Sequence, residues 1–413
     1  MQHTGQKDML KGIKVLDFGR VISGPFVGQV LSDLGADVIK IERPPNGDET
    51  RSYSSGDKPG NSSLFSTLNR NKRSLVIDLG HPSAKAVLIE LIKGADVLVH
   101  NFRPGVMERL GLAPKNVWEV NPGLVYCGIS GFGHGPLRER PANDVIAQAF
   151  AGLMSFTGDD SGPHVRVPIP VADYASGLFA LVGILAALVE RNVSGKGRCV
   201  ETSLIESMLA LECMHIGDFL KTGKLPPRLA SGNMLGQPNQ AFPTRDGAVV
   251  IATVNDEMWR KCARVLGGES LATDARYATG YDRLRLKDEL AGVIEALTLG
   301  LTTEECASRL ELAGVVCSPI NDLAQVASDP HIRALGILQR QDDLPSEPEL
   351  VASPLVIDGV RPRSRRRAPA LGQDAEAILI EAGFTPSTIE SLRAEGVVSS
   401  GPSYNRSGDR GAI

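Results

Sequence analysis

The sequence predicts an α/β protein whose N-terminal part forms a parallel, doubly wound sheet. Three observations support this fold class. Strand-like runs alternate with helical runs over about the first 130 residues. Prolines open the helical runs and glycines close them. The chain has 413 residues, of which 42% are hydrophobic and 22% charged, and this composition suits a globular protein of two or three domains.

The first strand–helix–strand unit spans residues 13–41. Ile13–Phe18 and Asp37–Ile41 are strand-like, and Pro25–Leu34 between them has helical spacing that Gly35 stops. The cycle then repeats, with strands predicted at Ser74–Asp78, Asp96–His100 and Leu124–Ile129 and a helix between Pro82 and Gly94. Such alternation is typical of a parallel sheet with helices on both faces.

Ligands of parallel α/β sheets collect at the carboxyl ends of the strands. The candidate ligand loops are therefore Gly19–Gly24, Glu42–Pro45, Asn101–Gly105 and Ser130–Gly135. A nicotinamide cofactor is disfavoured, although Glu42 stands where a ribose-binding acid would, because the first loop lacks the GxGxxG pattern.

Arginines follow several of the predicted strands, at Arg43, Arg103 and Arg109. A guanidinium group suits phosphates because it offers bidentate contacts and does not deprotonate. The alternative for each single arginine is a surface ion pair.

The stretch Val165–Leu204 carries the most informative acid. A strand-like alternation ends at Val171, Asp173 follows, and Ala175–Val189 is a run of fifteen residues without a charge. This run is shorter than the roughly 20 residues of a membrane span and indicates a core helix; a strand at Arg198–Thr202 follows it. Asp173 at this junction is either a helix N-cap or a positioned nucleophile, and the two roles are compatible.

Composition limits the partners. A net charge of −4 gives no sign of nucleic-acid binding, and the five arginines of Arg361–Arg367 are interpreted as a solvated connection.

The N-terminal residues lack the apolar core of a signal peptide, and the six cysteines are scattered, so a cytoplasmic protein is expected. No CxxC or HExxH motif occurs, so no metal site is expected. Cys127 is interpreted as a buried small hydrophobe, and residues 399–413 as a disordered tail.

Six long motifs occur in order between about residue 10 and residue 398. They are LKGIKVLDFGRVISGPFVGQVLSDLGADVIKIERP, NRNKRSLVIDL, ADVLVHNFRPGVMERLGL, GISGFGHGP, VADYASGLFALVGILAALVERNVSGKGRCVETSL and RAPALGQDAEAIL. In these motifs the chain resembles the class III coenzyme A transferases, the family of formyl-CoA transferase and of the carnitine and bile-acid CoA transferases.

The resemblance implies a large Rossmann-like domain formed by residues 1–220 and 331–398, a smaller α+β domain at 221–330, and an interlocked homodimer of ring-shaped subunits. The segment expected to form the small domain has fitting signals of its own. They are a Gly/Pro/Asn-rich loop at Ser231–Gln240, a strand pair around Thr244–Gly247, a helix near Asp256–Leu266 and a capping-box pattern from Thr302 to Glu305. The chain would return to the large domain through Ser353–Arg367 and a helix after Gly372.

The resemblance also implies a chemistry. Asp173 would attack the thioester of an acyl-CoA, pass through a mixed anhydride and an aspartyl-CoA thioester, and need neither a metal nor a permanently bound cofactor. The positions that would contact CoA are Ile22, Ser23, Arg43, Ile77, Asn101, Phe102, Arg103 and Arg109, with Asn143 and Asp144 near the reacting centre. Ile22 replaces a glutamine of formyl-CoA transferase and the four-glycine loop of that enzyme is missing, so formyl or oxalyl specificity is not expected.

Two alternatives stay open. One is a 2-methylacyl-CoA racemase of the same fold, in which Asp173 and a histidine would shuttle a proton. Asn143 stands where that histidine is expected and cannot act as a general acid or base, and His134 is the substitute nearby. The other is a CoA-binding homologue without turnover; the retained Asp173 favours an enzyme.

Overall fold

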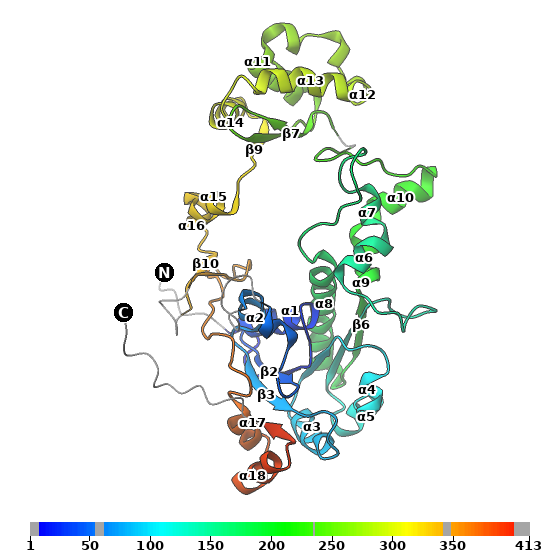
Figure 1. The fold of residues 1–413 in the computed structure, drawn as a ribbon, viewed down its shortest axis with the longest axis vertical. Helices are drawn as coiled ribbons and strands as arrows, with labels where there is room; N and C mark the ends of the chain where they lie inside the picture. Colours follow the sequence, from blue (N-terminus) through cyan, green and yellow to red (C-terminus); the bar gives the residue numbers. More distant parts are fainter. Residues whose placement is uncertain (1–7, 54–61, 234–235, 342–347, 400–413) are drawn as a thin grey trace. The chain divides into compact units, whose positions relative to one another are not determined.

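The computed structural model describes residues 8–53, 62–233, 236–341 and 348–399. The chain divides into two compact units, drawn with their elements in Figure 1. Among the described residues, unit 1 holds 8–153, 166–224 and 333–399, and unit 2 holds 154–165 and 225–332. The segment 154–165, expected in the large domain, therefore groups with unit 2.

Unit 1 is built around a seven-stranded sheet. Its strands are β1 (Lys14–Asp17), β2 (Asp37–Glu42), β3 (Arg73–Ile77), β4 (Val97–His100), β5 (Val125–Ser130), β6 (Cys199–Ser203) and β12 (Val398–Ser399). Their order is β12-β3-β2-β1-β4-β5-β6, and every neighbouring pair is parallel except β12 with β3. The predicted parallel α/β sheet is confirmed.

Helices cover both faces of this sheet because successive strand residues point to opposite faces. Val15, Val97 and Val125 pack with α1 (Ser23–Asp33) and α8 (Val171–Ser194). The alternate residues Leu16 and Leu98 belong to a cluster with α3 (Ala84–Lys93), α5 (Pro114–Val120), α17 (Ala375–Glu381) and α18 (Pro386–Ala394). Cys127 is fully buried in the first of these clusters, as expected for a small hydrophobe.

The remaining elements of unit 1 are short. They are η1 (Glu49–Ser52), α2 (Ser63–Asn69), α4 (Val106–Arg109), α6 (Asp144–Ala151), α9 (Leu204–Leu211), α10 (Cys213–Thr222), β10 (Leu338–Gln339) and β11 (Leu350–Val351). Three further helices, α7 (Leu153–Phe156), α15 (Leu323–Ser328) and α16 (Pro330–Ala334), lie at or near the points where the chain passes between the units.

Helix α8 corrects two expectations. No strand forms at residues 165–170, because Pro168 and Pro170 have no N–H to donate to a ladder. The helix begins at Val171, with Pro170 at the N-cap, so Asp173 lies inside the first turn and is not the cap.

Within the described residues one helix, α8, is long and apolar enough to cross a membrane. It has 24 residues, more than the fifteen-residue run suggested, so its length does not exclude a span. Its packing does place it in the core of unit 1, since Ala180, Ile184 and Leu188 lie against the sheet.

Unit 2 is an α+β unit with its own core. An antiparallel sheet of β7 (Asn239–Pro243), β8 (Ala248–Ala252) and β9 (Val316–Pro319) packs with α11 (Asp256–Ala272), α13 (Lys287–Thr298) and α14 (Thr303–Leu312). The short η2 (Ala275–Tyr277) and α12 (Gly280–Arg285) complete it. The predicted capping box of Thr302 and Glu305 is confirmed, as are the strand pair and the helix beginning at Asp256.

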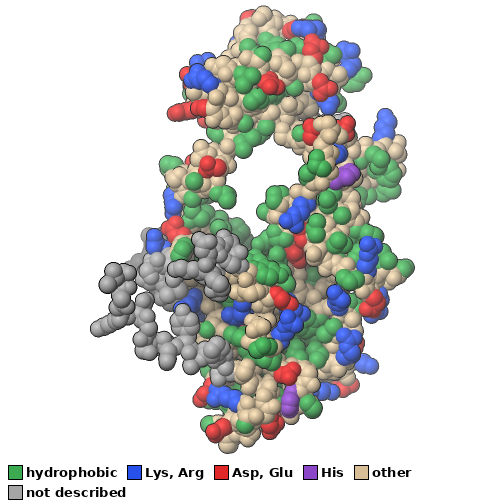
Figure 2. All heavy atoms as spheres, in the orientation of Figure 1, with side chains coloured by type: hydrophobic (Ala, Val, Ile, Leu, Met, Phe, Trp, Pro, Cys, Tyr) green, Lys and Arg blue, Asp and Glu red, His purple; other side chains and the backbone are tan. Residues whose placement is uncertain are grey.

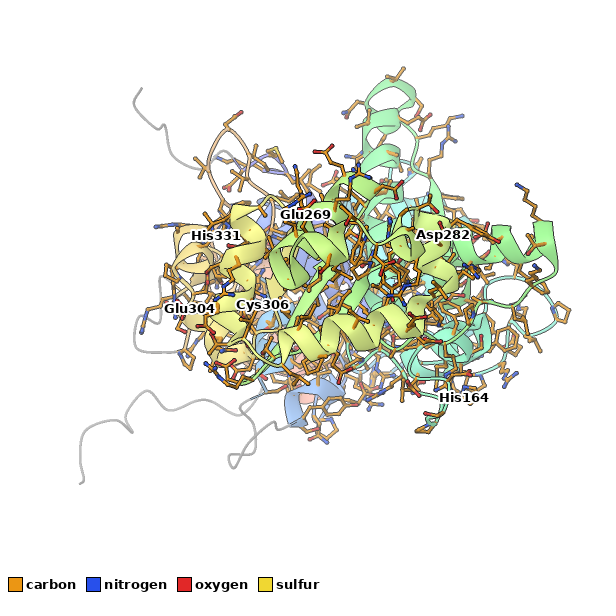
Figure 3. All side chains as sticks on the ribbon, turned by 90° about the horizontal axis from the view of Figure 1, so that it is seen from above. His164, Glu269, Asp282, Glu304, Cys306 and His331 are labelled. Carbon is orange, nitrogen blue, oxygen red and sulfur yellow. The ribbon has the colours of Figure 1, made fainter. Side chains whose placement is uncertain are left out.

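Three acidic side chains of unit 2 lie on separate helices rather than in one cluster. Glu269, Asp282 and Glu304 lie on different helices, well apart in Figure 3. Among the described residues of the whole chain, no group of three or more His, Cys, Asp and Glu side chains could hold a metal ion.

Two segments near the C-terminus were interpreted from composition. In the arginine run, Arg361 donates to the Ser353 carbonyl (2.6 Å) within the same connection, and Arg365 pairs with Asp8 (2.9 Å) and so ties the connection to the N-terminal part of unit 1. On the face drawn in Figure 2, basic and acidic side chains are interspersed. Ser399, expected in the tail, is the last residue of β12, and residues 400–413 lie outside the described residues.

Candidate active site

Asp173 lies in the first turn of α8, beside two other helices of unit 1. Its carboxyl group is largely buried, and Ser23 of α1 and Asp144 of α6 are near enough to act on its charge. Burial, and to a lesser extent the Asp144 charge, raise the pKa of Asp173 to about 7, and the Ser23 hydroxyl acts in the opposite direction. An aspartate that titrates near neutral pH inside a fold is a candidate for chemistry.

Asn101 joins the loops that follow β1 and β4. Its Oδ1 accepts from the Arg20 N–H (2.8 Å), and its Nδ2 donates to the Arg20 carbonyl (2.8 Å) and to Ser23 Oγ (3.0 Å). These strands are neighbours at the point where the strand order reverses, which is where such sheets bind ligands. The predicted residues Ser23, Asn101 and Asp173 are therefore brought together.

Asp144 fixes the start of α8. Its Oδ1 accepts from the Ala172 N–H (2.9 Å), one residue before Asp173, and its Oδ2 accepts from Gln148 Nε2 (2.7 Å). The Gln148 Oε1 in turn accepts from the Val167 N–H (2.9 Å). Asn143, the residue before Asp144, caps α6 by accepting from the Ile146 N–H (3.2 Å).

The loop between β1 and α1 is held in a strained form. Val21 has a φ of +62°, which is uncommon for a β-branched residue. Its N–H donates to Asp48 Oδ2 (3.3 Å), and Lys40 Nζ binds both Asp48 Oδ2 (2.9 Å) and the Gly19 carbonyl (2.9 Å). Gly19 and Gly24 pass so close that a Cβ on Gly24 would lie 2.6 Å from Gly19 Cα.

A second buried ion pair lies beneath the same loop. Lys72 Nζ binds Asp17 Oδ2 (2.7 Å) and the Pro25 carbonyl (2.8 Å), and both side chains are fully buried. Asp17 Oδ1 accepts from the Gly19 N–H (2.8 Å).

The residues of these two pairs were not predicted as part of the site. A buried ion pair of Lys40 could have been predicted, because a lysine in the apolar strand Val38–Ile41 must be paired if the strand is buried.

The predicted phosphate-binding arginines do not share one contact network. Arg43 is exposed and pairs with Glu49 (3.2 Å), which also pairs with Arg20. Arg103 and Arg109 are exposed as well, Arg103 after β4 and Arg109 at the end of α4. Glu42, where a ribose-binding acid was considered, is buried and bound by Arg51 (2.7 Å) and Ser74 (2.7 Å).

Three predicted contact positions are apolar. Ile22 is the N-cap residue of α1 and Phe102 packs edge-on against Phe18, with ring centroids 6.5 Å apart. Ile77 has no exposed surface and lies in the core cluster beneath α3 and α17. Its side chain is therefore closed to a ligand, and a contact at residue 77 would have to use the backbone.

A pocket of about 240 Å³ opens at the carboxyl ends of β4, β5 and β6. His100, Phe102, Arg103, Tyr126 and His134 are among its lining residues. Burial lowers the pKa of His100 to about 4, so this side chain is neutral. His134 is mostly exposed and lies 3.4 Å from Glu201, in the manner of a solvated loop histidine.

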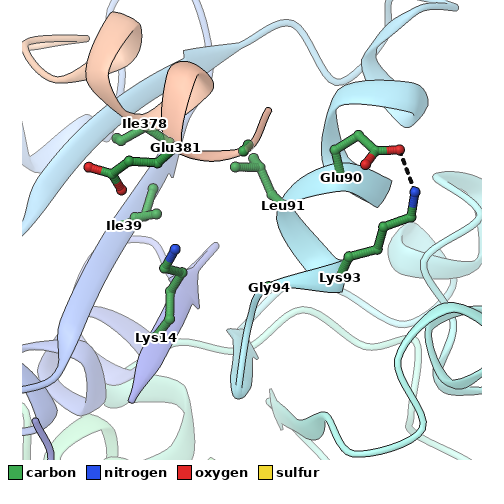
Figure 4. A pocket seen from close by; sticks show the side chains of 9 residues that line it. Lys14, Ile39, Glu90, Leu91, Lys93, Gly94, Ile378 and Glu381 are labelled. Atoms are coloured by element: carbon green, nitrogen blue, oxygen red, sulfur yellow. Dashed lines mark hydrogen bonds and ion pairs between the residues drawn. The ribbon is translucent and has the colours of Figure 1, made fainter. Parts of the chain in front are cut away.

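Another pocket, of about 270 Å³, lies between α3 and α17, toward the amino ends of β1 and β4 (Figure 4). Its charged groups include Lys93, which is paired with Glu90 (2.6 Å), and Glu381. This pocket is remote in the fold from the loops that follow the strands, and none of the predicted site residues line it.

Known proteins resemble this chain in sequence and in fold. Residues 10–375 match the family model described as CoA-transferase family III. The chain belongs to this family. It is 33% identical to succinate–glutarate CoA-transferase of Agrobacterium fabrum over 387 residues, 91% of this chain and 96% of that protein. It is 36% identical to acetyl-CoA:oxalate CoA-transferase of Acetobacter aceti over 379 residues, 90% of this chain and 95% of that protein.

The fold of this CoA-transferase is also that of a solved relative. A CAIB/BAIF family protein from Brucella suis superposes with a TM-score of 0.81 at 32% identity, covering 90% of this chain and 99% of that one. As a family III CoA-transferase, the protein acts on CoA thioesters and carboxylic acids.

Proposed function

We propose that this CoA-transferase moves coenzyme A from an acyl-CoA to a free carboxylic acid through covalent intermediates on Asp173. The observation that carries the proposal is the largely buried Asp173 carboxyl group in the first turn of α8, close to Ser23 and titrating near neutral pH. A carboxylate with a pKa of about 7 is both substantially ionised at neutral pH and more basic than an ordinary aspartate.

The chemistry alternates between two activated forms of Asp173. A carboxylate oxygen attacks the thioester carbonyl, the C–S bond breaks, and CoA leaves as a thiolate while a mixed anhydride forms. The thiolate then attacks the Asp173 carbonyl carbon and expels the donor acid as a carboxylate, which leaves an aspartyl-CoA thioester. The acceptor carboxylate repeats the sequence in reverse, so no bond is hydrolysed and each step exchanges acyl derivatives of comparable reactivity.

CoA is proposed to lie over the loops that follow β1, β2 and β4. Arg43, Arg103 and Arg109 are the exposed cations of these loops and of α4, and they suit the phosphates of CoA. Ser23 and Asn101 lie between these loops and Asp173. The acceptor is proposed to be a small carboxylic acid, in a cytoplasmic setting.

The oligomer is proposed to be an interlocked homodimer. In the single chain, one face of α8 exposes a row of apolar side chains, with Leu178 52%, Val182 65% and Val189 69% exposed. Apolar side chains also lie over α10 in Figure 2, where Leu220 is 77% exposed. A second subunit that covered these helices would remove this surface from water.

The covalent intermediate is tested by incubating the enzyme with acyl-CoA donors, among them acetyl-CoA and succinyl-CoA, without an acceptor. We expect mass spectrometry to find an acyl or CoA adduct on the peptide that contains Asp173, and hydroxylamine to convert the same carboxyl to a hydroxamate. Asp173→Asn, which keeps the shape and removes the anion, should lose adduct and transfer while CoA binding persists. Asp288→Asn, at an aspartate that is 93% exposed on α13, should keep both.

The opposing result is equally specific. Absence of adduct with every donor, together with entry of solvent deuterium at the α-carbon of a 2-methylacyl-CoA, would replace the transferase mechanism by the racemase.

A further inference from the structure

The backbone that leads into α8 is held by side chains and not by a sheet. Residues 165–170 form no strand, and Pro168 and Pro170 have no N–H to donate. The helix begins at Val171 with Pro170 at its N-cap, and a proline offers no capping side chain. The free amides at the start of α8 therefore need acceptors from elsewhere in the fold.

Two residues of α6, four positions apart, provide these contacts. Asp144 Oδ1 accepts from the Ala172 N–H (2.9 Å), so Asp144 caps α8 from a neighbouring helix. Gln148 bonds to both backbone groups of Val167: its Oε1 accepts from the N–H (2.9 Å) and its Nε2 donates to the carbonyl (3.2 Å). The two side chains thus hold the chain at residues 167 and 172, on either side of the two prolines.

Gln148 is also bonded to Asp144. Its Nε2 donates to Asp144 Oδ2 (2.7 Å), and its amide orientation is fixed because Oε1 must face the Val167 N–H. Gln148 has no exposed surface and Asp144 is 8% exposed, so water does not freely replace these bonds. Losing one of them would leave a buried polar group unpaired.

Farther along, α8 is held by a different helix. Gly177 lets α1 approach closely, because a Cβ at this position would lie 2.7 Å from the Phe26 ring and 3.2 Å from the Ser23 carbonyl. Asp173 lies one turn before Gly177 and directly after Ala172. The place of its carboxyl group therefore depends on both supports, and α6 provides the one at the start of the helix.

We propose that Gln148 is a positioning residue for the nucleophile: through Asp144 and the backbone of residues 167–172 it fixes the first turn of α8, and with it the Asp173 carboxyl group. Gln148 exchanges no proton and forms no bond with substrate in this role. The inference rests on the proposed function of Asp173. It predicts a loss of rate without a loss of CoA affinity, because misplacing a reacting group by about 1 Å can cost roughly 100-fold.

The test exchanges the carboxylate and the amide between the two positions. Asp144→Asn alone would set two amide N–H₂ groups against each other, and Gln148→Glu alone would set two carboxylates against each other. The double variant Asp144→Asn/Gln148→Glu reverses the direction of the bond between the side chains and keeps the net charge. Acceptors for the Val167 and Ala172 N–H groups remain, and only the longest bond, to the Val167 carbonyl, is lost.

The readout is the rate of single-turnover adduct formation at pH 9, well above the Asp173 pKa of about 7. Each single variant should form the adduct about 10 to 100 times more slowly than the wild type. The double variant should return to within about threefold of the wild-type rate. The dissociation constant of free CoA, measured by calorimetry, should stay unchanged. Hydrogen exchange in the peptide that contains Ala172 should be faster in the single variants and slow again in the double variant.

Two further variants keep the test decisive if a charge at position 148 impairs folding. Gln148→Met has a similar volume, brings no charge and breaks the same bonds, so it should also form the adduct slowly. Gln29→Met is the matched control: Gln29 is a buried glutamine of α1 that donates to Asp33 (2.6 Å), four residues along the same helix. This variant should keep the wild-type rate and CoA affinity.

Two kinds of failure are distinguishable. If the wild type forms no adduct, Asp173 is not the nucleophile and both proposals fail. The role of Gln148 alone is overturned if the wild type forms the adduct but the double variant is no faster than the slower single variant. Full rate in Gln148→Met, or a loss of CoA affinity that matches the loss of rate, would overturn it as well.

Discussion

Asp173 is held in an environment that disfavours its charge. Burial and the Asp144 carboxylate both raise its pKa, and the nearby Ser23 hydroxyl offsets part of this rise. An aspartate used purely as a helix cap would gain from the free amides at the helix start. The structure gives Asp173 a position in the first turn and no capping hydrogen bond, so the fold bears a cost at this residue.

This cost predicts a pH-dependent stability difference. A carboxyl whose pKa is about 7 in the fold and near 4 in the unfolded chain binds more protons when folded, so its contribution is fully favourable below pH 4 and is lost as pH rises through 7. Asp173→Asn should therefore gain stability over the wild type between pH 4 and pH 8, on the order of 4 kcal/mol for a pKa difference of about three units. Urea unfolding at both pH values checks this, and an equal difference at the two would contradict the raised pKa.

At the residue scale, the sequence identified the side chains of the site more successfully than it predicted their contacts. The motif placed Asp173, Ser23 and Asn101 in one site, and the structure brings these three together. The proximity of Ser23 to Asp173 could not be predicted, because it depends on how closely α1 and α8 cross at Gly177. For Ile77, the motif predicted a contact with CoA. It could not show that the side chain is buried in the core.

At the scale of elements, the six parallel strands of unit 1 were predicted to within one residue, whereas β12 and the connections were not. Alternation and glycine stops are local signals, and β1, β2 and β5 follow them. The strand expected before Asp173 failed because the apolar alternation was weighted above Pro168 and Pro170. The buried lysines beneath the β1–α1 loop were also missed, since pairing across the sheet is not a local signal.

The pair of Lys72 and Asp17 makes that loop sensitive to substitution. Lys72→Met would leave the fully buried Asp17 charge without its cation, which should cost about 3–5 kcal/mol. Asp17→Asn combined with Lys72→Met removes both charges and keeps an acceptor for the Gly19 N–H, so it should recover much of this loss. Denaturant midpoints of the single and double variants measure both effects, and a double variant no better than the single would argue against charge burial as the cause.

At the scale of the whole molecule, the exposed apolar row on α8 predicts self-association. Purified protein should run as a dimer at low micromolar concentration in light scattering, without dissociating on dilution. Val182→Glu places a charge on this row and should yield monomer or aggregate, whereas Val182→Leu should stay dimeric. A monomeric wild type would show that the row has another partner.

The antiparallel strand β12 completes the sheet only late in synthesis, because it pairs with β3 from the far end of the chain. β3 pairs with β2 on one side and with β12 on the other, and Arg73 at the start of β3 also binds Glu381, 308 residues later. A ribosome therefore exposes the edge of β3, with unpaired backbone groups, until β12 at Val398–Ser399 has been synthesised. The nascent chain needs protection at that edge until then, and a transcript truncated before β12 should yield a product that recruits chaperones rather than a smaller working enzyme.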